Sequence, residues 1–131
     1  MQIHRLPADD LEYAVLAEIW ELGAASVRDV YERLGKPQGL VYTTIGKVLD
    51  RLRGKGLVER KRSGKAFIYR PTVARDDVER ARAEYALSRL LGPTPRAAVA
   101  ALVNAVDAVN PLLLEELERA VVAHRRSKRG A

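Results

Sequence analysis

Residues 39–71 constrain the fold more than any other part of the chain, because an amphipathic helix is followed there by a basic hairpin. Apolar residues recur at the spacing of a helix that buries one face: Val41, Ile45, Val48, Leu49 and Leu52. Glycines 54 and 56 end this helix, and strands at about 57–62 and 66–70 flank a turn at Ser63-Gly64. This order is typical of a winged helix-turn-helix DNA-binding domain.

The positive charge of the chain gathers in the same stretch. Nine Lys and Arg residues stand against two acids between Lys47 and Arg70, a net charge of +7, whereas the whole chain of 131 residues carries +6. Residues 73–123 are slightly acidic, and the last eight residues are basic again. Composition alone fits a merely soluble basic surface equally well, but the uneven distribution favours a nucleic-acid partner.

Several function classes are disfavoured by what the sequence lacks. There is no cysteine, and no apolar run approaches the length of about 18 residues that a membrane span needs. The two histidines, His4 and His124, lie near opposite ends without carboxylate partners at ligand spacing, and no phosphate-binding loop or nucleophile motif occurs. We therefore expect a cytoplasmic protein that is not an enzyme, with no catalytic residues, metal site, cofactor or membrane association.

The first 72 residues read as one domain. Asp9 or Asp10 caps a helix that ends at Leu22, and Ser26 opens a second helix through an approximate capping box with Asp29. A turn at residues 35–39 leads to the third helix, at about 40–53. The expected core includes Trp20, Leu52, Leu57 and Ile68.

The chain beyond this domain is expected to be helical throughout, which makes the fold class mainly α. Helices are predicted at about 75–91, 95–109 and 111–126, separated by Gly-Pro and Asn-Pro breaks. Three short helices cannot bury a stable core alone, so residues 73–126 are interpreted as a homodimerisation region; the alternative is packing against the first domain. The basic tail, 127–131, is expected to be disordered.

The third helix carries the expected DNA-reading side chains on its polar side. Hydroxyls there can contact phosphates or bases, and Lys or Arg can reach guanine acceptors in the major groove. The candidates on this helix are Tyr42, Thr43, Thr44, Lys47 and Arg51. Tyr42 could equally pack against the domain, and Arg28 in the second helix is a further phosphate-binding candidate.

The hairpin supplies the expected wing. Its candidate DNA contacts are Arg60, Arg62, Ser63 and Lys65. The alternative interpretation is a solvated edge strand whose charges guard against aggregation, but the charge density at the turn favours the wing.

Four segments, L-E-Y-A-V-L-A-E-I-W, S-V-R-D-V-Y-E-R-L, V-Y-T-T-I-G-K-V-L-D-R-L and K-G-L-V-E-R-K-R-S-G-K-A-F-I-Y-R-P, resemble in order and spacing the penicillinase-repressor family of the BlaI/MecI type. The similarity is strong over residues 9–72 and looser to about 122. The resemblance implies a homodimeric bacterial repressor that binds dyad-symmetric operators, often of β-lactam-resistance genes. It assigns residues 42, 43, 44, 47 and 51 to the recognition helix and residues 62–65 to the wing.

Two departures from the family pattern concern regulation. The copper-responsive branch carries carboxy-terminal cysteines, which this chain lacks, so copper sensing is not expected. The β-lactam branch is inactivated by a sensor-linked protease at an Asn followed by a bulky apolar residue. The matching segment here is Leu102–Val106, which places the corresponding bond between Asn104 and the small Ala105.

Three functions follow from these patterns. The leading prediction is a sequence-specific repressor. One alternative is a winged-helix protein-interaction module, but such a module would not need the basic stretch. The other is a non-specific architectural DNA-binding protein; the paired threonines and a dimer with two reading helices argue against it.

Overall fold

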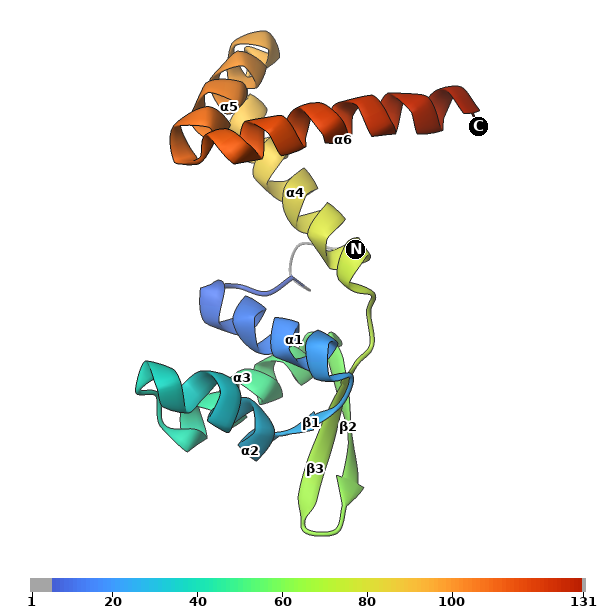
Figure 1. Cartoon of the computed structure of the whole chain (residues 1–131). Coiled ribbons are helices and arrows are strands. Elements are labelled where there is room, and N and C mark those ends of the chain that lie inside the picture. The colour runs from blue at the N-terminus through green and yellow to red at the C-terminus, as the bar shows by residue number, and fades with distance from the viewer. Residues whose placement is uncertain (1–5, 131) are drawn as a thin grey trace. The chain divides into compact units, whose positions relative to one another are not determined.

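The amphipathic segment forms helix α3 (Tyr42–Gly54), which packs against α1 (Asp10–Leu22). The computed structural model describes residues 6–130 and divides into two compact units, with the division between Tyr85 and Ala86. Figure 1 shows the helices of the first unit and the hairpin that projects from them. The expected mainly helical fold class with a winged helix-turn-helix domain is confirmed.

The first two helices begin as the sequence predicts. The carboxylate of Asp9 accepts from the backbone N–H of Glu12, and Gly23 follows α1 with φ of +78°, in the region that favours glycine. Ser26 and Asp29 form a complete capping box at α2 (Val27–Val30). A π-helical turn (Tyr31–Gly35) and a 3-10 turn (Lys36–Gln38) then lead toward α3.

The sheet has three antiparallel strands in the order β1-β3-β2. Strands β2 (Val58–Ser63) and β3 (Ala66–Pro71) form the expected hairpin. The two-residue strand β1 (Ala25–Ser26), which the sequence did not predict, pairs with Tyr69 and Ile68 of β3. A strand this short has no alternation of apolar and polar residues by which it could be recognised.

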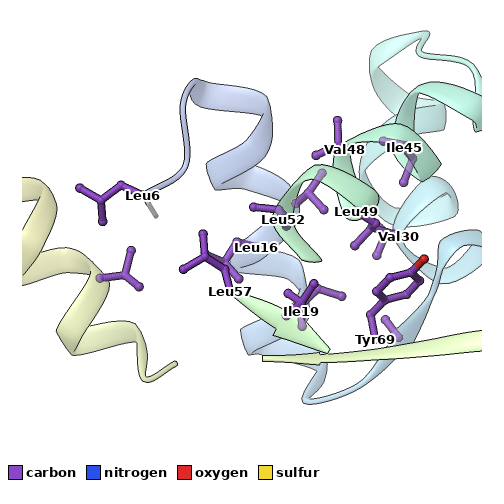
Figure 2. Packing of buried hydrophobic residues seen from close by; sticks show 14 residues of the cluster. Leu6, Leu16, Ile19, Val30, Ile45, Val48, Leu49, Leu52, Leu57 and Tyr69 are labelled. Atoms are coloured by element: carbon purple, nitrogen blue, oxygen red, sulfur yellow. The ribbon is translucent and has the colours of Figure 1, made fainter. Parts of the chain in front are cut away.

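Buried side chains from α1, α2, α3 and the hairpin meet in one cluster (Figure 2). Two expected core positions differ. Val41 is 61% exposed because it precedes α3 in an extended conformation, so the helical spacing does not apply to it. On β3 the buried residue is Tyr69 rather than Ile68, which is only half-buried, because alternation along the strand turns Tyr69 inward. Trp20 packs against this core but is half-buried.

The first unit extends beyond the predicted boundary at residue 72 because the start of α4 (Arg75–Leu91) packs on it. Val78 is fully buried in the same core cluster. The indole N–H of Trp20 donates to the carbonyl of Val73 over 3.1 Å. Tyr13 donates a hydrogen bond to Glu79, and the guanidinium of Arg82 lies 3.8 Å from the centre of the Tyr13 ring.

The second unit contains the end of α4, α5 (Pro95–Val109) and α6 (Pro111–Gly130), and α5 and α6 pack against each other (Figure 1). None of residues 86–130 is buried. Residues 127–130, for which the sequence predicts a disordered tail, continue α6 in the structure. Lys and Arg are good helix formers, and Lys128 and Arg129 lie in the last turn, where cations stabilise the helix dipole.

Gly35 should tolerate no side chain. A Cβ added there would lie 2.9 Å from Cγ1 and 3.1 Å from Cδ1 of Ile45, where the turn after α2 meets α3. We expect Gly35→Ala to lower the free energy of unfolding by about 1–3 kcal/mol through overpacking. Gly54→Ala is the matched control, since its Cβ would meet nothing within 4 Å. Urea unfolding of both variants measures the difference, and equal stability would contradict the close approach.

Candidate nucleic-acid interface

Helix α3 separates a buried face from an exposed one. Its buried side chains are Ile45, Val48, Leu49 and Leu52. On the opposite side Thr43, Lys47 and Asp50 are exposed, with Gly46 half-buried between them. The spacing of three and four residues places all of these on one helical face. Thr44 is half-buried at the edge of that face.

The exposed face of α3 and the hairpin form the two sides of an open groove with a volume of about 450 Å³. Val27, the first residue of α2, also lines it. The residues that line the groove are Val27, Tyr42, Thr43, Gly46, Lys47, Asp50, Arg60 and Tyr69. The groove therefore brings together four sequence-predicted site residues, 42, 43, 47 and 60, that come from two different elements.

Aromatic packing holds the first turn of α3. The rings of Tyr31 and Tyr42 meet edge to face with centres 5.6 Å apart, and the guanidinium of Arg28 lies 5.7 Å from the centre of the Tyr42 ring. Tyr42 nevertheless remains 44% exposed. Tyr42 thus both packs and faces solvent, and Arg28 adds a positive charge beside it.

The hairpin carries a cluster of arginines around Phe67, an aromatic residue that was not among the sequence-predicted site residues. The guanidinium of Arg60 lies 4.0 Å from the centre of the Phe67 ring and donates to the hydroxyl of Tyr69 over 3.4 Å. Arg62 lies 5.9 Å from the same ring and donates to the carbonyl of Gly64 over 3.3 Å. The pairing of Arg62 with Phe67 across the hairpin could have been anticipated from the register. These interactions fix two cations on the hairpin.

The tip of the hairpin is polar and open. Ser63 and Lys65 are both exposed, and Gly64 between them adopts φ of +63°. The turn therefore presents a hydroxyl and an ammonium group without packing against the rest of the unit.

Arg51 is turned toward α1 and does not line the groove. Its Nε lies 3.5 Å from Oε2 of Glu12, a residue that is only 3% exposed. Lys55 donates to the other carboxylate oxygen over 2.6 Å. Glu12 had no predicted role, because a buried acid in an amphipathic helix is not distinguishable by spacing from an exposed one.

Comparison with known proteins places this geometry in a family. The family model described as penicillinase repressor matches residues 9–123. A protein named transcriptional regulator BlaI, from two strains of Mycobacterium tuberculosis, is 35% identical over 113 residues, which cover 86% of this chain and 80% of the relative. The chain belongs to the penicillinase repressor family.

Solved structures agree with this family on the fold. The solution structure of the DNA-binding domain of the repressor BlaI matches with a TM-score of 0.50 and 29% identity, over 55% of this chain and 89% of that one. A complex structure of hsRosR-S4 matches with a TM-score of 0.52 over 81% of this chain and 94% of that one, but at 21% identity it supports the fold alone. The chain is thus a BlaI-type transcriptional regulator with a winged-helix DNA-binding fold.

Family membership also confirms that the protein is not an enzyme, since the relatives are transcriptional repressors. Among residues 6–130, no group of three His, Asp or Glu side chains is placed to hold a metal ion; His4 lies outside the described residues. No helix within that range is long and apolar enough to cross a membrane. The expected cleavage residues, Asn104 and Ala105, are exposed and lie inside α5.

Proposed function

We propose that this BlaI-type regulator represses transcription as a homodimer that binds double-stranded DNA at inverted-repeat operators. The observation that carries the proposal is the groove between α3 and the hairpin, which combines Thr43 and Lys47 with the fixed cation of Arg60. An α-helix of this kind fits the major groove, and basic side chains beside it neutralise phosphates.

The homodimer accounts for the apolar surface of the second unit. Nine large apolar side chains there are between 38% and 78% exposed: Leu87, Leu90, Val99, Val103, Val109, Leu112, Leu113, Val121 and Val122. An apolar surface of this extent is unfavourable in water unless a partner covers it. A second copy is the simplest partner, and its twofold symmetry would present two reading helices to one DNA duplex.

Two other functions remain as alternatives. A winged-helix protein-interaction module would not need the arginine and lysine side chains that the hairpin presents. A non-specific architectural DNA-binding protein would not need polar side chains on the exposed face of α3 to contact base edges. The groove residues Thr43 and Lys47 favour sequence-specific binding over both.

The wing assignment is tested by the salt dependence of binding. Replacing Arg60, Arg62 and Lys65 together by alanine should reduce the slope of log affinity against log salt by about 2–3, because each neutralised phosphate accounts for about 0.9. The control replaces Arg80, Arg96 and Arg119, which carry the same charge on α4, α5 and α6 and should leave the slope unchanged. If the two triple variants have equal slopes of log affinity against log salt, the hairpin does not contact DNA as a wing. Lys47→Ala should also relax sequence preference.

The family also suggests which genes the protein regulates and where in the cell it acts. We propose that the operators lie before antibiotic-resistance or related genes and that the protein acts in the cytoplasm, where bacterial DNA lies. Genome-wide mapping of bound sites tests the first point directly, and a neighbouring gene for a membrane-bound sensor protease would support the route of induction.

Induction by proteolysis is proposed at the bond between Asn104 and Ala105. Both residues lie within α5, so a protease needs local unfolding of that helix to reach the bond. We expect cleavage only by a dedicated sensor-linked protease, and mass spectrometry of the repressor from induced cells should find a fragment ending at Asn104. Intact repressor together with an unoccupied operator would exclude this route.

A further inference from the structure

Asp50 stands out among the groove residues because it is acidic. It lies three residues after Lys47 and seven after Thr43, on the exposed face of α3, and its side chain lines the groove. The whole stretch from Lys47 to Arg70 contains one other acid, Glu59, which does not line the groove. An acid on a DNA-reading face calls for an explanation, because it repels the phosphates that the nearby cations attract.

No ion pair within the described residues involves this carboxylate. Within residues 6–130, no Lys, Arg or His nitrogen lies within ion-pair distance of Asp50. Arg60 lines the same groove, but its guanidinium is held over Phe67 and bonded to Tyr69. Arg51, the next residue on α3, is turned to Glu12. The carboxylate is therefore free to accept hydrogen bonds from a ligand in the groove.

The floor of the groove beside Asp50 is open. Gly46 lies one helical turn before it and carries no side chain, and even an added Cβ would meet only Val27, at 4.0 Å. A base edge can thus approach the backbone of α3 between Thr43 and Asp50. A glycine inside a helix is less favourable than an alanine there, so the open floor reduces the stability of α3.

The chemistry of the base edges indicates what an acid can read there. Phosphates offer only acceptors, which a carboxylate cannot bind, whereas cytosine presents its exocyclic N4 amino group as a donor in the major groove. We propose that Asp50 is a specificity-determining residue that accepts a hydrogen bond from a cytosine amino group in each operator half-site and weakens binding to unmatched DNA. This inference rests on the proposed function, in which α3 reads the major groove.

The proposal predicts a change of preference at one base pair in each half-site. Duplexes selected from a randomised pool by the full-length protein should contain a fixed cytosine that Asp50→Ala no longer selects. The ratio of specific to random-sequence affinity should fall by about 5-fold for each half-site, the lower end of the discrimination that a good base-edge pair provides. Asp50→Asn should move the preference from cytosine to adenine, since a carboxamide pairs with the adenine edge.

Glu59→Gln is the matched control, because it removes one negative charge from the same basic stretch without touching the groove. It should raise affinity for specific and random DNA by the same factor and keep the selected sequence. If Asp50→Ala behaves like this control, the Asp50 inference is overturned while sequence-specific binding stands. If the unmodified protein selects no sequence, the proposed function fails and the inference fails with it.

Discussion

A fragment that ends at Tyr85 is expected to bind the operator about 10²- to 10⁴-fold more weakly than the full chain, because two linked half-site interactions become independent. The fragment retains the complete buried core, including Val78, and the hydrogen bond between Trp20 and Val73. It should therefore fold as a monomer and bind a single half-site. Sedimentation and titration with one-half-site and two-half-site duplexes measure both properties.

The position of the cut matters. A fragment that ends at Thr72 lacks Val78 and the Val73 carbonyl, so it exposes part of the core and leaves the Trp20 indole N–H without its partner. We expect this shorter fragment to be much less stable than the one ending at Tyr85, as urea unfolding would show. If the Tyr85 fragment sediments as a full dimer, the second unit is not the dimerisation region.

The sequence predicted the elements better than it predicted their limits. Caps and glycines at Ser26, Asp29 and Gly23 are local signals, and the structure confirms them because they act within a few residues. The strand β1 and the docking of α4 depend on interactions between residues more than 40 positions apart, such as Ala25 with Tyr69 and Trp20 with Val73. No periodicity within a short window reports such interactions.

The same limit applies to the candidate site. The charge of the wing and the polar face of α3 were visible in the sequence, but the direction of each side chain was not. Lys47 and Arg51 are one helical turn apart, yet the first lines the groove and the second pairs with Glu12 of α1. From the sequence Asp50 is only an acid in a basic stretch, because the lack of an ion pair to its carboxylate is a property of the folded unit.

Glu12 and Lys55 should respond unequally to substitution. Glu12 is 3% exposed. Its carboxylate accepts from Lys55 over 2.6 Å and from the backbone N–H of Ala8 over 3.2 Å, and it lies 3.5 Å from Arg51. The side chain of Lys55 is 21% exposed and also donates to the carbonyl of Leu6. Lys55 can therefore reach water if its partner is removed, whereas Glu12 cannot.

Lys55→Met is expected to lower the free energy of unfolding by about 2–4 kcal/mol, because it leaves a buried carboxylate with Arg51, at a longer distance, as its remaining cation. Glu12→Gln keeps the shape and the acceptor oxygen, and we expect a decrease of about 1–2 kcal/mol. The double variant Glu12→Leu with Lys55→Met removes both charges and should be closer to the unmodified protein than Lys55→Met alone. Urea unfolding of the three variants measures these differences.

The consequence for DNA reading follows from where this network lies. It joins the end of α3 to the start of α1, so we expect it to hold the orientation of α3, the proposed reading helix. Lys55→Met should therefore weaken operator binding even under conditions in which the variant remains folded, and the selected sequence should not change, because Lys55 does not line the groove. A larger decrease in stability for Glu12→Gln than for Lys55→Met would show that the Glu12 carboxylate does not depend on Lys55, and unchanged operator binding by folded Lys55→Met would show that this ion pair does not hold α3.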